Sequence, residues 1–582
     1  MSVTELFDEG DAIPEGYPAL IRNESDPNAI AAPLLQVHAP RALMLTHAAD
    51  LMKGGWRYAT GLPGFFNETL SLDDAQAVLT RQLEAREQSF LTVLDKGIYS
   101  RPNSPYCRLL RHAGLNFEDV KSMVKDRGLE LALSDLYEAG VYVTLDEVKG
   151  RVPIRRPGLE FPVSAMDFDN PLAARHYAAS TGGSQGGGTR IDIDFDLVAH
   201  DSASLICSLE AVGVADRPVF VWRAAPPSFY GLQLILRFAR IGRMPERWFA
   251  PNPPRWNRQG LQGRGFTAYT LLMSRLCGSP VPRPEYIEDA DDIVGPIAEA
   301  TRRGTPPVVY CIQNQAVRIC LAAERAGADI RGTVFFSSGE PCTEGKAAVL
   351  ARVGARAAPQ YGMQEAGPVC LPCGNPAAAD DMHFMSDKLA VVVRTKDLAP
   401  ETSVPALFYT SLLPSASKLM LNVESGDYGV VEQRDCGCQW QRLGFSTHMH
   451  HVRSYEKLTS EGVMFLGSVL YELLEETLPA CFGGGPTDYQ LVEEEEDGVT
   501  RVRLVISPSV GPVDEGAVLK AFYDRMSFAD WSRRHADLWR HNGTLRVERR
   551  QPYMTRVGKV LPLHVLGEAP AEHSGSSQSP SS

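Results

Sequence analysis

Four consecutive segments between residues 305 and 354 constrain the fold of this chain more than any other part. TPPVVYCI (305–312) and GTVFFSS (332–338) are rich in β-branched and aromatic residues, which is typical of buried strands. NQAVRICLAAERA (314–326) and TEGKAAVLAR (343–352) indicate helices, the first of them ended by Gly327. Strand, helix, strand and helix at this spacing predict parallel βαβ units in an α/β fold, whose ligands bind at the carboxyl ends of the strands.

The composition narrows the classes of partner. Apolar residues make up 44% of the chain, charged residues make up 22%, and the formal charge is -13, so nucleic acid and anionic membrane surfaces are not the expected partners. No signal peptide and no apolar run of about 18 residues is visible. The eleven cysteines, an odd number, therefore indicate reduced thiols and a cytoplasmic protein. The oligomeric state is not predicted.

A length of 582 residues exceeds what a single hydrophobic core usually serves, so more than one domain is expected. GSVLYELLEETLPA (467–480) predicts an amphipathic helix, YQLVEEEEDGVTRVRLVI (489–506) predicts a hairpin, and another helix is expected from about Asp514. These elements predict a small α+β unit. The predicted division is an N-terminal extension with helices (1–90), a large α/β domain (91–452), a small C-terminal α+β domain (453–567) and a disordered tail (568–582).

The stretch STGGSQGGGTR (180–190) is a loop, because it is too poor in side chains to build a core. Its backbone N–H groups and hydroxyls suit the binding of an anion, although a flexible surface loop has the same composition. No Gly-Lys-Ser/Thr sequence ends it, as a Walker loop requires, and no helix is expected directly after it. The loop alone therefore decides nothing.

The loop is followed by four further motifs: FFSSGEP (335–341), PQYGMQEAGPV (359–369), ESGDYG (424–429) and TRVGKV (555–560). In this order and at these intervals, over roughly residues 85–565, the set resembles the adenylate-forming superfamily of acyl- and aryl-CoA ligases, adenylation domains and luciferases. The resemblance is greatest to phenylacetate-CoA ligase and its relatives.

The resemblance implies an AMP-forming ligase, in which the large domain (91–452) binds ATP and the acid and the small domain (453–567) is a mobile lid. Such an enzyme joins a carboxylic acid to the α-phosphate of ATP, releases pyrophosphate and transfers the acyl group to a nucleophile, with Mg²⁺ and a lysine to offset the negative charge. CoA is the expected acceptor and an aromatic or otherwise apolar acid is the expected substrate. A carrier-protein thiol or an amine as acceptor, and a catalytically silent nucleotide-binding relative, are the alternatives.

The resemblance also implies roles for particular residues. Glu365 would ligate Mg²⁺, Tyr361 would lie against adenine, Asp427 would accept hydrogen bonds from the ribose, and Lys559 would approach the acid and the α-phosphate. Phe229 and Tyr230 are candidates for the acyl pocket. The remaining predicted ATP-binding residues are Ser180, Thr181, Gly182, Gly183, Ser184, Ser338, Gly339, Glu340, Pro341, Gly362, Gln364 and Arg453.

The segment VRSYEKLTSEGVMFLG (452–467) resembles the hinge about which the small domain of such enzymes swings. Tyr455 and Glu456 stand where the family usually has two aspartates, and Gln364 replaces the usual Ser or Thr beside the glutamate. These departures indicate a divergent member in a specialised pathway, and the hinge departures bear on the acceptor step and not on adenylation.

Two close cysteine pairs, Cys370 with Cys373 and Cys436 with Cys438, are separated by His383. Zinc prefers four tetrahedral sulfur or nitrogen ligands, so we expect a structural zinc bound by Cys370 or Cys373, His383, Cys436 and Cys438. Some relatives of phenylacetate-CoA ligase have a similar arrangement. Reduced thiols in loops are the alternative.

Overall fold

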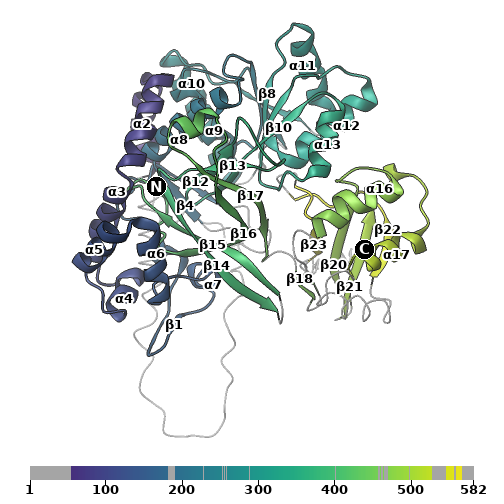
Figure 1. The fold of residues 1–582 in the computed structure, drawn as a ribbon. Coiled ribbons are helices and arrows are strands. Elements are labelled where there is room, and N and C mark those ends of the chain that lie inside the picture. Colours follow the sequence, from purple (N-terminus) through teal and green to yellow (C-terminus); the bar gives the residue numbers. More distant parts are fainter. Residues whose placement is uncertain are drawn as a thin grey trace, which may run out of the picture. The chain divides into compact units, whose positions relative to one another are not determined.

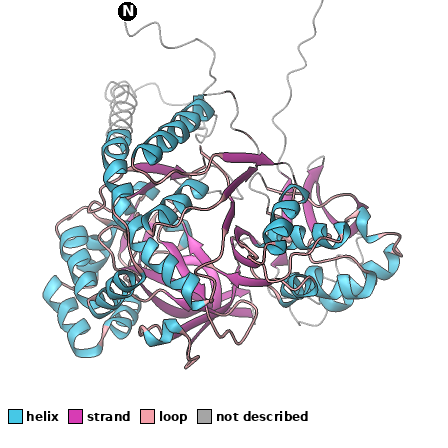
Figure 2. Cartoon of the chain, turned by 90° about the horizontal axis from the view of Figure 1, so that it is seen from above, coloured by secondary structure: helices cyan, strands magenta, loops and turns pink. Residues whose placement is uncertain are grey.

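The computed structural model describes residues 54–180, 190–226, 228–251, 253, 256, 258–287, 289–399, 402–455, 459–460, 463–464, 470–496, 499–526, 545–555 and 559–566. All of these residues belong to one compact unit, Lys53–Ser582. In this unit strands run through the middle and helices lie outside them (Figure 2). None of its described helices is both long and apolar enough to span a bilayer.

A six-stranded parallel sheet confirms the predicted α/β class. Its order is β10-β9-β8-β5-β6-β7, so the chain fills one half of the sheet and then the other, with the switch between β5 and β8. The two segments predicted as strands are β8 and β9, which pair directly. The strands are β5 (Val219–Trp222), β6 (Arg247–Pro251), β7 (Pro284–Ile287), β8 (Val308–Ile312), β9 (Val334–Ser338) and β10 (Arg356–Pro359).

Helices connect these strands, as the βαβ pattern predicts (Figure 1). Gly327 ends α12 with φ of +61°, a conformation that glycine adopts without a steric penalty. The helices of this region are α8 (Phe195–Ala211), α9 (Tyr230–Arg240), α10 (Arg258–Leu276), α11 (Asp291–Arg302), α12 (Gln313–Ala326) and α13 (Glu344–Arg352).

A second, seven-stranded sheet is antiparallel throughout and is not predicted by the sequence analysis. Its order is β11-β12-β13-β17-β16-β15-β14. It carries Tyr361, Asp427 and the cysteine–histidine segments, so it positions much of the candidate site. The strands are β11 (Tyr361–Met363), β12 (Gly367–Pro372), β13 (Met382–Phe384), β14 (Leu389–Ala399), β15 (Thr402–Ser411), β16 (Val423–Gln433) and β17 (Thr447–Ser454).

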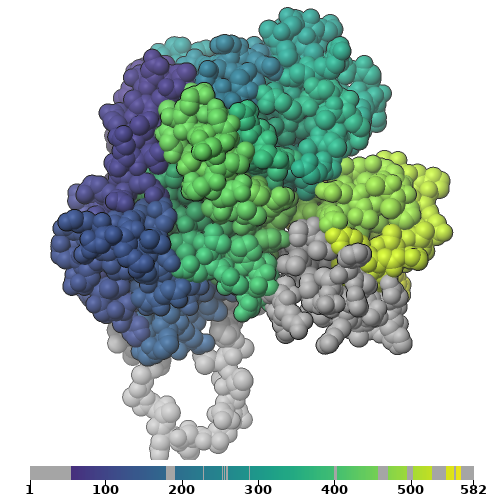
Figure 3. Space-filling view, viewed as in Figure 1, coloured from purple at the N-terminus to yellow at the C-terminus, as the bar shows by residue number. Residues whose placement is uncertain are grey.

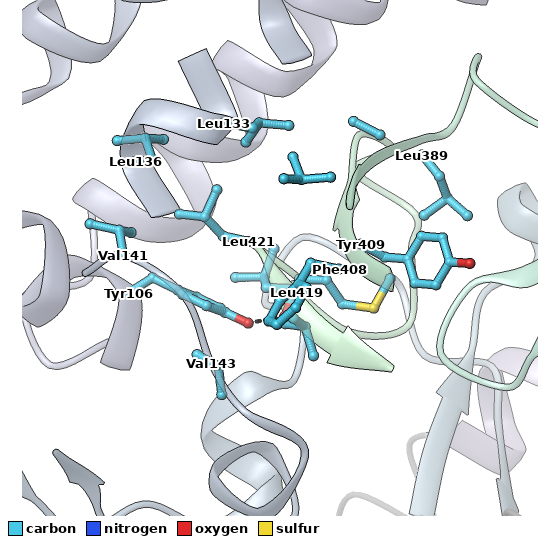
Figure 4. Close-up of a cluster of buried hydrophobic side chains, with 14 of the residues drawn as sticks. Tyr106, Leu133, Leu136, Val141, Val143, Leu389, Phe408, Tyr409, Leu419 and Leu421 are labelled. Atoms are coloured by element: carbon cyan, nitrogen blue, oxygen red, sulfur yellow. Dashed lines mark hydrogen bonds between the residues drawn. The ribbon is translucent and has the colours of Figure 1, made fainter. Parts of the chain in front are cut away.

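The N-terminal helices pack against this antiparallel sheet. Tyr106 of α4 is fully buried among apolar side chains of α6 and β15, and its hydroxyl donates to Leu419 O at 3.0 Å (Figure 4). Burial of such a side chain contributes about 1.5–3 kcal/mol. After a helix over residues 54–67 come α2 (Leu72–Glu84), α3 (Arg86–Val93), η2 (Leu94–Tyr99), α4 (Pro105–His112), α5 (Phe117–Arg127), α6 (Leu129–Glu138), α7 (Leu145–Val148), β1 (Ile154–Arg156), β2 (Leu159–Phe161) and η3 (Ala165–Phe168).

A smaller cluster joins α2 to the cysteine-rich region. Ala75 and Leu79 of α2 are buried with Trp440 and Phe445, which lie in and after the short helix α14 (Gln439–Arg442). In the space-filling view the green atoms of this region lie directly against the purple atoms of α2 (Figure 3). The cysteine-rich region is therefore part of the packed core and not a loosely packed surface loop.

The small C-terminal α+β unit is also confirmed, with sheet order β22-β21-β20-β23. The predicted hairpin is β20 and β21, and the helix expected near Asp514 is α17. The helix expected over 467–480 is π-helical in its middle. The elements are η4 (Glu472–Thr477), α16 (Leu478–Phe482), β20 (Tyr489–Glu496), β21 (Val499–Ile506), η5 (Pro508–Val510), α17 (Glu515–Met526), β22 (Leu545–Arg549) and β23 (Leu563–Leu566); the short strands β18 (Thr459–Ser460) and β19 (Val463–Met464) precede them.

The glycine-rich loop is framed by two antiparallel strands, β3 (Tyr177–Ser180) and β4 (Arg190–Ile193). Thr181, Gly182, Gly183 and Ser184 lie outside the described residues. As expected, no helix follows the loop directly, because β4 does; the helix α8 begins after it at Phe195, capped by Asp194, whose carboxylate accepts from Asp196 N at 3.0 Å. The apolar residues of α8 are spread around its circumference, which hid the amphipathic pattern.

Candidate functional site

The carboxyl ends of β5, β8 and β9 meet at the switch point of the parallel sheet. Arg223, directly after β5, donates through one guanidinium nitrogen to Cys311 O and to Ser338 Oγ, both at 2.6 Å. Burial lowers the pKa of Arg223. Ligands of open α/β sheets bind at such a point, and the arginine joins three strand ends there. The sequence analysis did not identify Arg223, because a single arginine in the stretch VWRAAPP matches no motif.

Glu340 is held in place just beyond β9. Asn314, at the start of α12, donates to its carboxylate through its backbone N (3.0 Å) and its side-chain Nδ2 (3.1 Å). The same Nδ2 atom also donates to Val560 O at 3.0 Å. Burial raises the pKa of Glu340, and the nearby Lys346 and Lys559 oppose that rise. Asn314 therefore ties the segment 335–341 to the segment 555–560.

Lys559 lies at the same place. Its Nζ donates to Gly339 O at 2.9 Å, across 220 residues of sequence. Its backbone is fixed by Thr555, whose Oγ1 accepts from Lys559 N at 3.0 Å. Gly339 has φ of +86°, a conformation that favours glycine, and a Cβ there would also crowd Lys559 Cε at 3.1 Å.

Tyr361 and Asp427 meet on the antiparallel sheet. The tyrosine hydroxyl donates to Asp427 Oδ2 at 2.6 Å, and burial together with this carboxylate raises the pKa of Tyr361 well above its usual value. Asp427 pairs with Ser454 on the neighbouring strand β17, one residue beyond Arg453. The hydroxyl of one motif and the carboxylate of another are therefore in direct contact.

Arg453 and Tyr471 add a cation and an aromatic ring to this region. Arg453 donates to Asp380 Oδ2 at 2.8 Å, with both side chains buried, and its guanidinium lies 5.7 Å from the ring centroid of Tyr471. Burial raises the pKa of Tyr471, and Glu475, Glu340 and Asp427 add to the rise while Arg453 opposes it. Tyr471 thus lies in the electrostatic field of the predicted residues Glu340, Asp427 and Arg453, and the sequence analysis missed it.

A buried ion pair joins α13 to η4. Lys346 Nζ lies 2.7 Å from a Glu475 carboxylate oxygen, and Thr343 Oγ1 donates to the other oxygen at 2.6 Å. Lys346 Nζ also donates to Pro341 O at 3.3 Å. This pair holds the first helical turns of the small unit beside the segment 338–341.

Glu365 lies in the turn between β11 and β12. Burial raises the pKa of its carboxyl, and Lys418 and Lys149 oppose the rise. The turn is anchored by Lys388, whose Nζ donates to Ala366 O at 2.8 Å and to Asp201 Oδ1 at 2.7 Å. Gln364 is half-buried in the same turn, and a Cβ at Gly362 would approach Gly367 O to 2.9 Å.

The residues predicted for the hinge and for the acyl pocket lie in different surroundings. Tyr455 is buried, and its hydroxyl donates to Glu424; Glu456 lies outside the described residues. Phe229 stacks on Tyr177 with 4.9 Å between ring centroids. Tyr230, the first residue of α9, is 40% exposed.

A second cluster lies where β12, β13 and β17 adjoin the loop after β16. The ligand atoms of Cys373, His383, Cys436 and His448 all lie within 4.8 Å of one another, and Cys438 Sγ lies 3.1 Å from His383 Nε2. Cys370, the alternative to Cys373 in the sequence analysis, instead contacts Met449 Sδ at 3.2 Å in the core. His448 was missed, because none of the three histidines in THMHH (447–451) stands at a recognisable ligand spacing from the cysteines.

The hydrogen bonds around this cluster suit a metal. His383 Nδ1 donates to Phe445 O at 2.9 Å, so the neutral ring directs the lone pair of Nε2 at the cysteine sulfurs. His448 Nδ1 lies 2.8 Å from Asp381 Oδ1 and 2.9 Å from a guanidinium nitrogen of Arg434, and its buried Nε2 has no hydrogen-bond partner among the described residues. Contact with Cys373, and then with His383, lowers the pKa of Cys438, and the same contact raises the pKa of Cys373. Thiolates with neutral imidazoles are the ligands that zinc prefers.

No family model and no curated protein matches this sequence. Solved structures of similar fold include a 2-hydroxyisobutyryl-CoA ligase in the postadenylation state in complex with R3-HIB-AMP (16% identity, 86% of this chain and 91% of that chain, TM-score 0.49). They also include the anthranilate CoA ligase AuaEII in complex with anthranoyl-AMP (11%, 66% and 64%, 0.39) and the amide bond synthetase McbA from Marinactinospora thermotolerans (13%, 86% and 98%, 0.38). At these identities and scores the role of no residue carries over from them.

Proposed function

We propose that the chain is an ATP-dependent, AMP-forming ligase that activates a carboxylic acid as an acyl-adenylate and then transfers the acyl group to a nucleophile. The observation that supports it most is the contact between Lys559 Nζ and Gly339 O, which joins two of the motifs at the strand ends of the parallel sheet. The hydrogen bond between Tyr361 and Asp427 joins two more.

In the proposed reaction the acid carboxylate attacks the α-phosphate and pyrophosphate leaves. Two anions must approach each other, and the ammonium group of Lys559 offsets the charge that builds up between them. Tyr361 and the segment 338–341 form the two walls for adenine, and the ionised carboxylate of Asp427 accepts from the ribose hydroxyls. Arg453 and Arg223 add positive charge beside the same nucleotide.

The phosphates and the cation are assigned to two other segments. The loop 180–184 offers backbone N–H groups and hydroxyls to the β- and γ-phosphates. Glu365 would ligate Mg²⁺, which prefers oxygen ligands and supplies positive charge to the phosphates. The carboxyl of Glu365 is held in a turn that Lys388 anchors, which suits a fixed ligand.

The proposal also names an acyl acceptor and a class of carboxylic acid. CoA is the favoured acceptor by the resemblance, and the hinge departures at Tyr455 and Glu456 favour a carrier-protein thiol or an amine as the second candidate. The stacked rings of Phe229 and Tyr177 suit an aromatic or apolar acid. Product analysis with CoA, a carrier protein and amines side by side separates these acceptors.

A catalytically silent nucleotide-binding relative is the rival from another class. Such a protein needs neither Glu365 nor Lys559, and both are retained in the chain. The cysteine–histidine cluster has a separate, structural role in the proposal: Cys373, His383 and Cys436 bind zinc together with Cys438 or His448, since a tetrahedral site uses four of the five.

Acid-dependent ATP–pyrophosphate exchange tests the proposal, with a panel of aryl and fatty acids. Lys559→Ala should lower the exchange rate about 100-fold or more, because one preorganised charge on the transition state is typically worth that much. Lys520→Ala, a change in an exposed lysine that pairs with Asp524, is the matched control and should exchange normally. ATP binding without exchange for any acid would instead support the silent relative.

A further inference from the structure

Two adjacent carboxylates connect the cysteine–histidine cluster to the proposed nucleotide site. Asp380 and Asp381 precede β13, and both are buried. Asp381 Oδ1 lies 2.8 Å from His448 Nδ1, while Asp380 accepts from Arg453 at 2.8 Å. His448 and Arg453 lie on the same strand, β17, so one dipeptide binds that strand at two points, one in the cluster and one in the nucleotide site.

The strand between these two points is irregular. His451 has φ of +52°, a left-handed conformation that is rare for a residue with a side chain. The pairing of β17 with β16 shifts register here, with Tyr428 opposite Arg453 but Val430 opposite His450, so a bulge lies across from Gly429. Asp380 Oδ2 accepts from His451 N at 3.1 Å, which holds the bulge in the form that directs Arg453 inward.

We propose that Asp380 is a positioning residue through which metal binding in the cluster strengthens nucleotide binding at Arg453. The inference rests on the proposed function, because it takes Arg453 as part of the nucleotide site. Arg434 and Ala377 N hold one oxygen of Asp381, and His448 Nδ1 contacts the other. A metal on His448 Nε2 fixes the imidazole and with it this second oxygen, and the short Asp380–Asp381 backbone transmits this order to Arg453. Without metal, the buried Nε2 is left without a partner and the ring is held from one side only.

Coupling of two binding sites is reciprocal, which makes the inference testable in the wild-type chain. AMP is the nucleotide probe, because it needs no Mg²⁺ that a chelator would remove, and Zn²⁺ is the metal probe. Isothermal titration calorimetry should give an AMP Kd at least about 5-fold weaker in zinc-depleted protein than in zinc-loaded protein. Saturating AMP should raise the Zn²⁺ affinity, measured by competition with a chromogenic chelator, by the same factor.

Asp380→Asn keeps the acceptor for His451 N and removes the charge that holds Arg453. It should bind Zn²⁺ as the wild type does in the absence of AMP and show an AMP Kd that no longer depends on zinc. Asp435→Asn is the matched control, because Asp435 adjoins Cys436 on the surface and bonds only to Gln441 among the contacts of its side chain seen here. This control should retain the full zinc dependence.

A wild-type AMP Kd that is equal with and without zinc overturns the inference, as does an unchanged zinc dependence in Asp380→Asn. Either result leaves the proposed nucleotide site standing, since AMP still binds. AMP that fails to bind zinc-loaded wild-type protein removes the proposed nucleotide site and the inference together. The chelator competition uses wild-type protein alone, so it decides the matter even where Asp380→Asn does not fold.

Discussion

Raising the pH from 6.5 to 9 should destabilise the protein through His200, a residue of α8 beside the network that anchors Glu365. One ring nitrogen of His200 lies 2.9 Å from Asp387 and the other lies 4.0 Å from Asp201. Burial lowers the pKa of His200, and Lys388 acts in the same direction. The two carboxylates outweigh both and raise the pKa to about 9.

The sign and the size follow from this pKa. Because it lies above the value of about 6.5 in the unfolded chain, the contribution of His200 is fully present below pH 6.5 and is lost as the pH rises through 9. The difference between the two values corresponds to about 3 kcal/mol in all, or a slope of about 1.4 kcal/mol per pH unit inside the window.

Urea unfolding followed by tryptophan fluorescence at several pH values from 6 to 8.5 measures this slope. The comparison is with His200→Gln, whose amide offers a donor to Asp387 but does not titrate. Burial raises the pKa of Cys207 and Cys311 to about 12, so their contribution changes only above pH 9 and outside this range. Parallel curves for the two proteins would refute the assignment of a charged His200 to the folded state.

Two further predictions concern single contacts. Tyr361→Phe removes the hydrogen bond to the Asp427 carboxylate. Because a hydrogen bond to a charged group is worth about 1.5–3 kcal/mol, the AMP Kd measured by calorimetry should rise roughly 10-fold or more. An unchanged Kd would show that Tyr361 does not contribute to nucleotide binding. Lys346→Met leaves Glu475 buried without its cation and should lower the free energy of unfolding by about 3–5 kcal/mol in chemical denaturation. The double variant Lys346→Met with Glu475→Leu should regain most of that loss. An equal loss in the single and double variants would contradict this prediction.

The elements that the sequence predicts well are those whose signals are local. The strands β8 and β9 and the helices α12 and α13 each carry their own composition and end signals within about 15 residues. The hairpin of β20 and β21 pairs neighbouring segments. Such elements need no knowledge of distant partners, and the parallel order of β8 and β9 follows from the helix between them.

The antiparallel sheet has no such local signal. Its strands β11 and β13 have three residues each, which is too short for an alternating pattern, and β13 pairs with β17 across more than 60 residues of sequence. That pairing places His383 opposite His448, so it creates the second histidine of the cluster. A ligand that depends on strand register cannot be found by counting the spacing of cysteines.

The same distinction explains which site residues were predicted. Gly339 and Lys559 lie in motifs whose local backbone is itself required: a glycine at positive φ, and a lysine on a turn closed by Thr555. Arg223 and Asp380 are single polar residues in unremarkable surroundings, and each acquires its role only from a partner on another strand. Their buried contacts hold the motif residues in place, so changes at Arg223 or Asp380 should alter nucleotide binding while every motif remains intact.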